Sequence, residues 1–166
     1  MQKKAGFTAF ELAVSLAVMA LIAALVLPPY LKWLRGHRLS GAATNLMGDM
    51  EMAKIRAIRE NDFVVIRFGP NSYTIFLDNG QPGGTAGDWL PAGESIIKSR
   101  ALPAGVKFDL NELNFEYVVS AATDDITRFS GRGLPDRITA ETDIPLINQG
   151  GSKTVKINRL GHMSVD

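Results

Sequence analysis

The sequence predicts an α+β protein, with one long N-terminal helix packed on a C-terminal antiparallel β-sheet domain. Two observations support this prediction. The first 60 residues combine a long apolar run with a helical repeat, and the rest alternates short β-prone segments with turn residues. At 166 residues, the chain is long enough for one domain with an appendage.

Composition excludes several classes of function. The chain is 46% hydrophobic and 21% charged, which is too apolar for a mostly disordered protein. A formal net charge of +1 does not favour bulk electrostatic binding of nucleic acid. The lack of cysteine excludes disulfides, thiol catalysis and cysteine-based zinc sites. Because no catalytic motif is present either, we expect no enzyme, cofactor or metal site.

The N-terminal segment predicts a membrane-spanning helix. All residues but one from Leu12 to Leu27 are apolar, and the 20 positions that end at Leu31 make about 30 Å of helix, enough to cross a bilayer core. Lys3 and Lys4 place the N-terminus on the cytoplasmic side. The chain after about residue 35 is therefore expected outside the inner face of the membrane.

Other interpretations of this segment explain less. A secretory signal peptide has a shorter apolar core and a small-x-small cleavage site, which residues 28–33 do not resemble. A buried core helix seldom has so long an apolar run. A plain membrane anchor does not explain Glu11, because a carboxylate in hydrocarbon costs about 2–3 kcal/mol and needs a partner or a function.

The run Gly6-Phe7-Thr8-Ala9-Phe10-Glu11-Leu12 resembles the class III signal of type IV pilins and type II secretion pseudopilins. The shared features are a short basic leader ending in Gly6, then Phe7, a glutamate at the fifth position after the leader, and an apolar helix. Pro28 stands where that family often has a helix-kinking proline. The leader, glycine, glutamate, apolar run and proline all have the spacing of the family.

The resemblance implies how the protein matures and assembles. A prepilin peptidase should cut between Gly6 and Phe7 and N-methylate Phe7. The apolar helix should hold the subunit in the inner membrane lipid and later pack in a filament core. Glu11 should pair with the N-terminal amine of a neighbouring subunit, since a costly carboxylate then gains a counter-charge only on assembly. Other pilins or pseudopilins and an inner-membrane assembly platform are the expected partners.

The resemblance also implies how the chain is divided into segments and where the protein lies in the cell. Loss of the leader removes Lys3 and Lys4 and changes the formal charge from +1 to −1. We expect a single-pass protein of the bacterial inner membrane with its globular domain in the periplasm. The expected segments are the leader (1–6), the transmembrane or filament-core helix (7–31), the amphipathic helix (32–60) and the periplasmic β-rich domain (61–166).

The segment after the two prolines predicts an amphipathic helix that ends at Asn61-Asp62. Its apolar positions recur at spacings of three and four, which places them on one face, whereas Arg38, Asp49, Lys54 and Arg56 lie mostly off it. Glycines at 36, 41 and 48 predict local bends rather than breaks. The apolar face comprises Leu39, Ala43, Leu46, Met50, Ala53 and Ala57.

The remainder predicts many short strands. Phe63–Phe68 and Ser72–Leu77 flank Gly69-Pro70-Asn71, which indicates a hairpin, and Asp78–Glu94 is predicted as a long loop around Trp89. Trp89 is interpreted either as the lid of a small core or as an exposed contact. The other predicted strands are Ser95–Leu102, Val106–Leu110, Asn114–Val119, Ile126–Phe129, Ile144–Ile147, Thr154–Asn158 and His162–Val165.

This second region resembles the GspH/FimT branch of minor pseudopilins and pilins. The shared features are the helix end at 53–58, the hairpin, a variable loop, Phe129-Ser130-Gly131-Arg132-Gly133, and a closing hairpin over 156–163. The resemblance implies a minor pseudopilin of the periplasmic pseudopilus of a type II secretion system. The alternatives are a minor type IV pilin, FimT-like, for pilus priming or DNA uptake, and a membrane-anchored binding module that never polymerises.

The β-rich region contains two further candidate sites. Arg132, Lys153, Lys156 and Arg159 form a candidate patch for DNA or a protein partner. Some FimT-like proteins bind DNA through a Gly-Arg-x-Arg motif, but here the turn after Arg159 lacks those arginines, so a solvated surface is favoured. Asp78, Asn79, Asp88 and Glu94 share one loop, but their spacing matches no EF-hand, so polar loop contacts are favoured over calcium.

Overall fold

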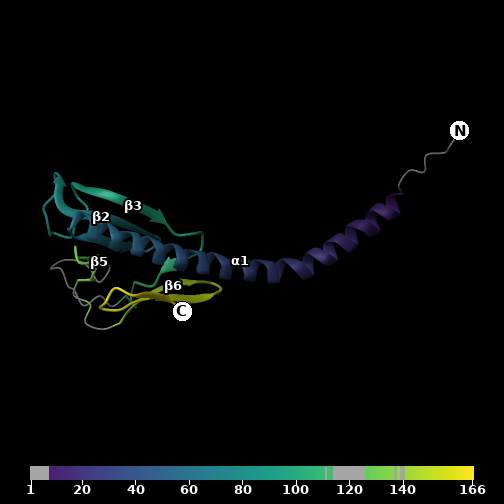
Figure 1. Cartoon of the computed structure of the whole chain (residues 1–166). Helices are drawn as coiled ribbons and strands as arrows, with labels where there is room; N and C mark the ends of the chain where they lie inside the picture. The colour runs from purple at the N-terminus through teal and green to yellow at the C-terminus, as the bar shows by residue number, and fades with distance from the viewer. Residues whose placement is uncertain (1–7, 111, 114–125, 137, 139–140) are drawn as a thin grey trace.

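A long helix carries the folded domain at its C-terminal end (Figure 1). The computed structural model describes residues 8–110, 112–113, 126–136, 138 and 141–166. Within these ranges α1 (Ala9–Glu60) precedes all the strands. The strands are β1 (Val64–Gly69), β2 (Ser72–Pro82), β3 (Glu94–Ala101), β4 (Lys107–Phe108), β5 (Ile126–Phe129), β6 (Thr142–Asn148), β7 (Gly151–Ile157) and β8 (Met163–Val165).

The helix α1 is continuous across both of its prolines. Thr8 caps its start, and Asn61 ends it in the left-handed conformation, with φ of 53°, which asparagine tolerates. Pro28 and Pro29 lie inside the helix, where each lacks the N–H of an i→i−4 hydrogen bond. The prediction of one helix through residue 60 is confirmed from Ala9 onward, and the stalk half is curved (Figure 1). The kink at Pro28 itself stays a prediction.

The amphipathic half of α1 packs as the residue spacing predicts, with one exception. All six predicted apolar positions are buried, with exposed fractions of 4% or less. The exception is Asp49, which was expected mostly off this face but is buried with 6% of its surface exposed. Hydrogen bonds from strands β2 and β3 satisfy its carboxylate, which is how a charged group is accommodated there.

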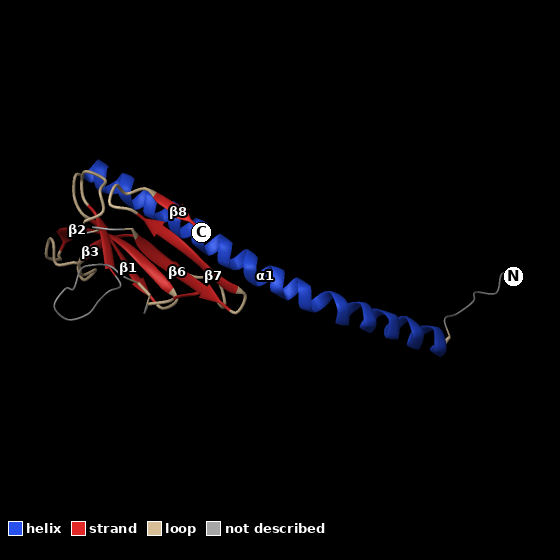
Figure 2. Ribbon diagram, turned by 90° about the horizontal axis from the view of Figure 1, so that it is seen from below, coloured by secondary structure: helices blue, strands red, loops and turns tan. Residues whose placement is uncertain are grey.

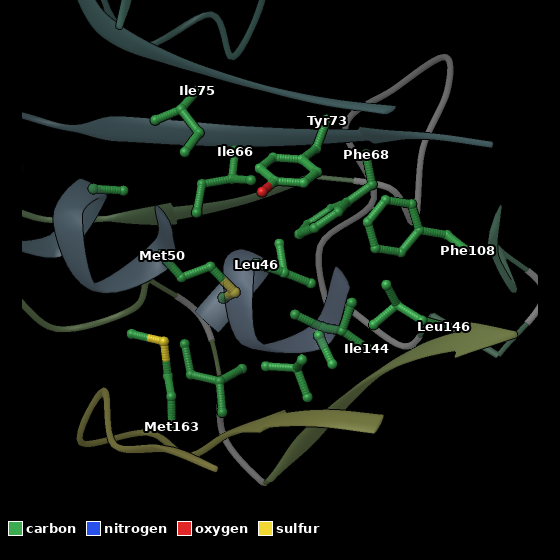
Figure 3. Packing of buried hydrophobic residues seen from close by; sticks show 14 of the residues in the cluster. Leu46, Met50, Ile66, Phe68, Tyr73, Ile75, Phe108, Ile144, Leu146 and Met163 are labelled. Atoms are coloured by element: carbon green, nitrogen blue, oxygen red, sulfur yellow. The ribbon is translucent and has the colours of Figure 1, made fainter. Parts of the chain in front are cut away.

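Two antiparallel sheets pack around this half of the helix. One has the strand order β3-β2-β1-β5 and the other β4-β6-β7-β8. Figure 2 shows the strands beside the C-terminal half of α1, with the stalk extending beyond them. In Figure 3, Leu46 and Met50 of the helix lie between Ile66 and Ile75 on one side and Ile144 on the other. The main core is therefore a helix held between two sheets.

The strand bounds correct several predictions. The predicted loop over 78–94 is wrong at both ends, because β2 extends through Pro82 and β3 begins at Glu94. The predicted strand over 106–110 is reduced to Lys107–Phe108, whereas β5 matches its prediction. The predicted strand over 114–119 lies outside the described residues. The hairpin prediction is confirmed by the pairing of β1 with β2 around Gly69 and Ser72.

A second, smaller core lies on the other face of the first sheet. Side chains alternate along β1, so that Val64 and Ile66 belong to the main core and Val65 faces the opposite way. Val65, Phe76, Trp89 and Ile126 make up this second core. Trp89 is only 4% exposed, so it is the lid of a small core rather than an exposed contact.

Candidate functional site

The start of the apolar helix is organised by Glu11. Its Oε2 accepts hydrogen bonds from the Thr8 backbone N–H and the Thr8 hydroxyl, both at 2.9 Å. The Thr8 Oγ1 in turn accepts from the Glu11 N–H at 3.2 Å, which completes a capping box. Glu11 was not predicted to cap the helix, although the Thr-x-x-Glu spacing before an apolar run is the signature of a capping box.

The capping box defines what the carboxylate does in the single subunit. It satisfies backbone donors at the helix N-terminus, where a negative charge is also favoured by the helix dipole. Both Thr8 and Glu11 are exposed in the isolated chain, so the carboxylate is accessible to a second partner. Gly6 and Phe7, the predicted processing residues, lie outside the described residues.

Among the described residues, none buries the apolar surface of the first half of α1. Every residue from Thr8 to Trp33 is exposed, and Phe10 and Leu25 reach 77% and 71%. An 18-residue window in this helix has a mean hydropathy of 2.5, so length and composition suffice to cross a membrane. An apolar surface of this extent needs a cover of lipid or of other protein chains.

The second half of α1 is fixed to the first sheet by Asp49. Its carboxylate accepts hydrogen bonds from the Tyr73 hydroxyl at 2.7 Å, from Lys98 Nζ at 2.7 Å and from Arg100 Nε at 2.8 Å. Burial alone would raise the pKa of Asp49, but the hydrogen bonds from Lys98 and Tyr73 and the charge of Arg100 outweigh it and lower the pKa. Burial, together with the Asp49 carboxylate, raises the pKa of Tyr73.

Arg128 ties the long loop to the first sheet. Its guanidinium lies 3.9 Å from the ring centre of Phe63 and 3.7 Å from that of Trp89, which places it between two aromatic faces. Its Nη2 is 2.6 Å from the carboxylate of Asp136, and its Nη1 is 3.6 Å from Asp78. Because aromatic rings and carboxylates surround it, Arg128 serves the fold and not a surface patch.

The acidic residues predicted to share one loop do meet. Oxygens of Asp78, Asp88 and Glu94 lie within 4.8 Å of one another, so these are the described residues that could hold a cation. Burial raises the pKa of Asp78, against the effects of the Gly87 N–H and Arg128. Oxygens of all three carboxylates also accept backbone N–H groups of the segment between Asp78 and Glu94, which are polar contacts of the predicted kind.

The four residues of the candidate basic patch are not equivalent. Lys153 and Lys156 lie three positions apart on β7, so strand alternation directs them to opposite faces of the sheet. Lys156 is also paired with Asp166 at 2.6 Å. Arg132 and Arg159 are exposed on two turns that meet near Gly133 and Gly161, at the C-terminal end of α1.

The fold and the N-terminal segment together define a class of protein. An exposed apolar half-helix, continuous with a half-helix that packs into a β-rich domain, is the architecture of a pilin-like protein. The family model described as Type II transport protein GspH matches residues 42–161. The chain therefore belongs to the GspH family, whose members are structural pseudopilins and not enzymes.

Solved structures show the same fold. The type IV minor pilin FimU of Pseudomonas aeruginosa is 15% identical, with 77% of this chain and 92% of that chain covered and a TM-score of 0.52. The minor pseudopilin EpsH from the Type 2 Secretion System of Vibrio cholerae is 12% identical, with 78% and 96% covered and a TM-score of 0.52. A comparison with curated protein sequences gave no match.

Proposed function

We propose that this protein is a minor pseudopilin of a type II secretion system, anchored in the bacterial inner membrane with its β-rich domain in the periplasm. The observation that carries the proposal is the exposed apolar half-helix with Glu11 at its start, on a domain of the GspH family. Such a helix is stable in a bilayer as a single subunit and in a filament core after assembly.

Proteolytic processing prepares the chain for filament assembly. In the proposal, a prepilin peptidase cuts between Gly6 and Phe7 and methylates the new N-terminus. The cut removes Lys3 and Lys4 and leaves an amine close to the capping box of Thr8 and Glu11. In the filament, Glu11 exchanges its contacts with Thr8 for the amine of a neighbouring subunit. A charge pair in a low-dielectric core then sets the register between subunits.

Variants at the helix start separate the charge of Glu11 from its capping role. Glu11→Gln keeps a side-chain oxygen that can cap Thr8 but removes the charge, so it should abolish incorporation into filaments. Thr8→Val removes the cap and keeps the charge, so incorporation should continue. Crosslinking of subunits in membranes measures incorporation, and Ser15→Ala is a matched control at the next turn. Normal assembly of Glu11→Gln would refute the charge-pairing mechanism.

A minor type IV pilin is the second candidate, because the similarity to FimU is as high as the similarity to EpsH. Deleting the gene distinguishes the two candidates. If the chain serves secretion, specific exoproteins should vanish from the culture supernatant and accumulate in the periplasm. If the supernatant proteome is unchanged while pili or DNA uptake are lost, the secretion proposal fails and the pilus candidate replaces it.

A further inference from the structure

The segment where α1 leaves the globular domain carries an unpaired set of cations. Lys32, Arg35 and Arg38 are exposed, and none of them has an ion pair in the described part of the chain. The sequence has no acidic residue between Glu11 and Asp49, so nothing on this stretch of the helix neutralises them. We call Lys32, Arg35 and Arg38 the cationic collar.

The collar occupies one side of the helix. At 100° per residue, its three members fall within about a third of the circumference, on the side of α1 that buries Leu39 and Leu46 against the sheets. The collar thus continues the sheet-facing side of α1 just beyond the edge of the domain. Tyr30 and Trp33 lie on other sides, with their ring centres 6.1 Å apart.

The edge of the domain completes a polar hollow beside the collar. The Asn148 side chain donates to the Arg35 carbonyl at 2.8 Å, which holds the turn between β6 and β7 against the helix. A hollow of about 290 Å³ lies there, and the residues that line it include two arginines and two residues with side-chain amides, of which the Asn148 amide is already bonded to the helix. Its lining consists of Arg35, Arg38, Ala104, Gly105, Asn148 and Gln149.

The position of the collar along the helix identifies its partner. The apolar run ends at Leu31, and Arg38 follows about 10 Å further along the axis, within reach of the headgroup layer of a bilayer. Tyr30 and Trp33 are 51% and 61% exposed, as expected for aromatic side chains at that interface. Cations at this depth face lipid phosphates.

We infer that the cationic collar binds the headgroups of anionic phospholipids in the outer leaflet of the membrane. This inference rests on the membrane orientation in the proposed function. In that orientation the collar opposes the positive-inside rule, because three cations outside weaken the signal of Lys3 and Lys4 inside. A feature that works against the orientation signal points to a separate role, and lipid binding supplies one.

Lipid selectivity of the full-length protein tests this inference. The chain is released from non-ionic detergent micelles that hold equal amounts of phosphatidylglycerol and phosphatidylcholine, and native mass spectrometry counts the lipid adducts. We expect at least about fivefold more phosphatidylglycerol than phosphatidylcholine adducts, since each cation near an anionic surface adds to the attraction. Equal adducts of the two lipids would overturn the inference.

Two variants separate charge from structure. The triple variant Lys32→Gln, Arg35→Gln, Arg38→Gln should reduce the adduct ratio to about one, whereas Lys32→Arg, Arg35→Lys, Arg38→Lys should keep it. The matched control is Arg59→Gln, Arg132→Gln, Arg159→Gln, which removes three exposed cations at the far end of the domain and should leave the ratio unchanged. An equal fall in the control would show a non-specific charge effect and refute the collar.

A different partner for the cationic collar would give a different experimental result. If the collar instead pairs with carboxylates of a neighbouring subunit, the lipid ratio is near one in all variants and the glutamine triple variant loses filament incorporation. That outcome overturns the inference. Because the lipid measurement uses a single subunit, its result does not bear on the Glu11 test, and the two proposals fail separately.

Discussion

At the scale of residues, Asp49 shows how a charged side chain can belong to a core. Three donors converge on one carboxylate, and one of them, the Tyr73 hydroxyl, belongs to a side chain only 1% exposed. The other two, Lys98 and Arg100, are about one-third exposed and can return to water when they lose their partner. The buried hydroxyl therefore dominates the cost of losing the carboxylate.

Replacing Asp49 tests whether the buried Tyr73 hydroxyl accounts for most of this cost. Asp49→Ala should lower the free energy of unfolding by about 1–3 kcal/mol, because it leaves a buried hydroxyl without an acceptor. In the double variant Asp49→Ala, Tyr73→Phe, part of that loss should be recovered, since the buried hydroxyl without an acceptor is no longer present. Chemical denaturation in detergent measures the wild type, each single variant, Asp49→Ala and Tyr73→Phe, and the double variant. Additive losses from the two substitutions would show that the residues do not interact.

The lowered pKa of Asp49 predicts a pH dependence of stability. A carboxyl whose pKa is lower in the folded state contributes stability that is complete above its unfolded value, near pH 4, and is lost as the pH falls through the folded value. The raised pKa of Asp78 has the opposite sign, since it favours the folded state as the pH falls. The pH dependence of stability of the wild-type protein alone would therefore combine the opposite effects of Asp49 and Asp78.

The difference in unfolding free energy between the wild type and Asp49→Asn isolates Asp49, because Asp78 is present in both proteins. We expect this difference to be constant from about pH 5 to pH 7 and to shrink below about pH 4. Denaturation curves at several pH values measure it. A difference that grows as the pH falls would contradict the lowered pKa.

At the scale of elements, glycines act differently in the helix and in the turns. An added Cβ at Gly48 of α1 would meet nothing within 4 Å, so this glycine only lowers helix propensity. Gly133 has φ of +74°, and its added Cβ would lie 2.6 Å from Ile58 Cδ1. The Gly131-Arg132-Gly133 run is thereby explained as a turn that closes over the end of α1.

These glycines give a paired prediction. Gly133→Ala should lower the free energy of unfolding by about 1–3 kcal/mol through backbone strain, with a further contribution from the displaced Ile58. Gly48→Ala should raise it by about 0.5–1 kcal/mol, because alanine favours the helix. Thermal unfolding of both variants measures the contrast. A stabilising effect of Gly133→Ala would contradict the described turn.

Sequence patterns predict those elements whose signal is local. The spacing of Leu39, Leu46 and Met50 gave the buried face of the helix, and Gly69-Pro70-Asn71 gave the first hairpin. The burial of Asp49 was missed because its partners follow 24 to 51 residues later, on β2 and β3. The capping box was present in the sequence as Thr8-x-x-Glu11, but Glu11 was interpreted through its cost in a membrane and its expected pairing with a neighbouring amine.

Long-range pairing could not be predicted in the same way. The division into two sheets depends on β5 pairing with β1 and on β4 pairing with β6, and neither pair is joined by a short turn that would predict the pairing. Likewise, the spacing of Asp78, Asp88 and Glu94 matches no motif, and only the turn of the chain after β2 brings them together.

At the scale of the whole molecule, α1 has two halves with different environments. Every residue from Thr8 to Trp33 is exposed in the single chain, whereas Leu39 is the first residue of the helix in the core. The stalk therefore contributes nothing by burial to the stability of the domain, and its apolar surface is available to lipid or to other subunits. Membrane insertion and filament assembly can then change the surroundings of the stalk without changing the domain.

Two truncations test this division. A fragment that begins at residue 32 keeps about two helical turns before Leu39, so it should be a soluble monomer with an unfolding free energy within about 0.5 kcal/mol of the full chain. A fragment that begins at residue 44 loses the burial of Leu39, Ala42 and Ala43 and should be less stable by about 2–4 kcal/mol. Size-exclusion chromatography and denaturation measure both fragments. If the longer fragment were as unstable as the shorter one, the exposed stalk would have to support the domain through contacts that the single chain does not make, and the two halves of α1 would not be energetically separate.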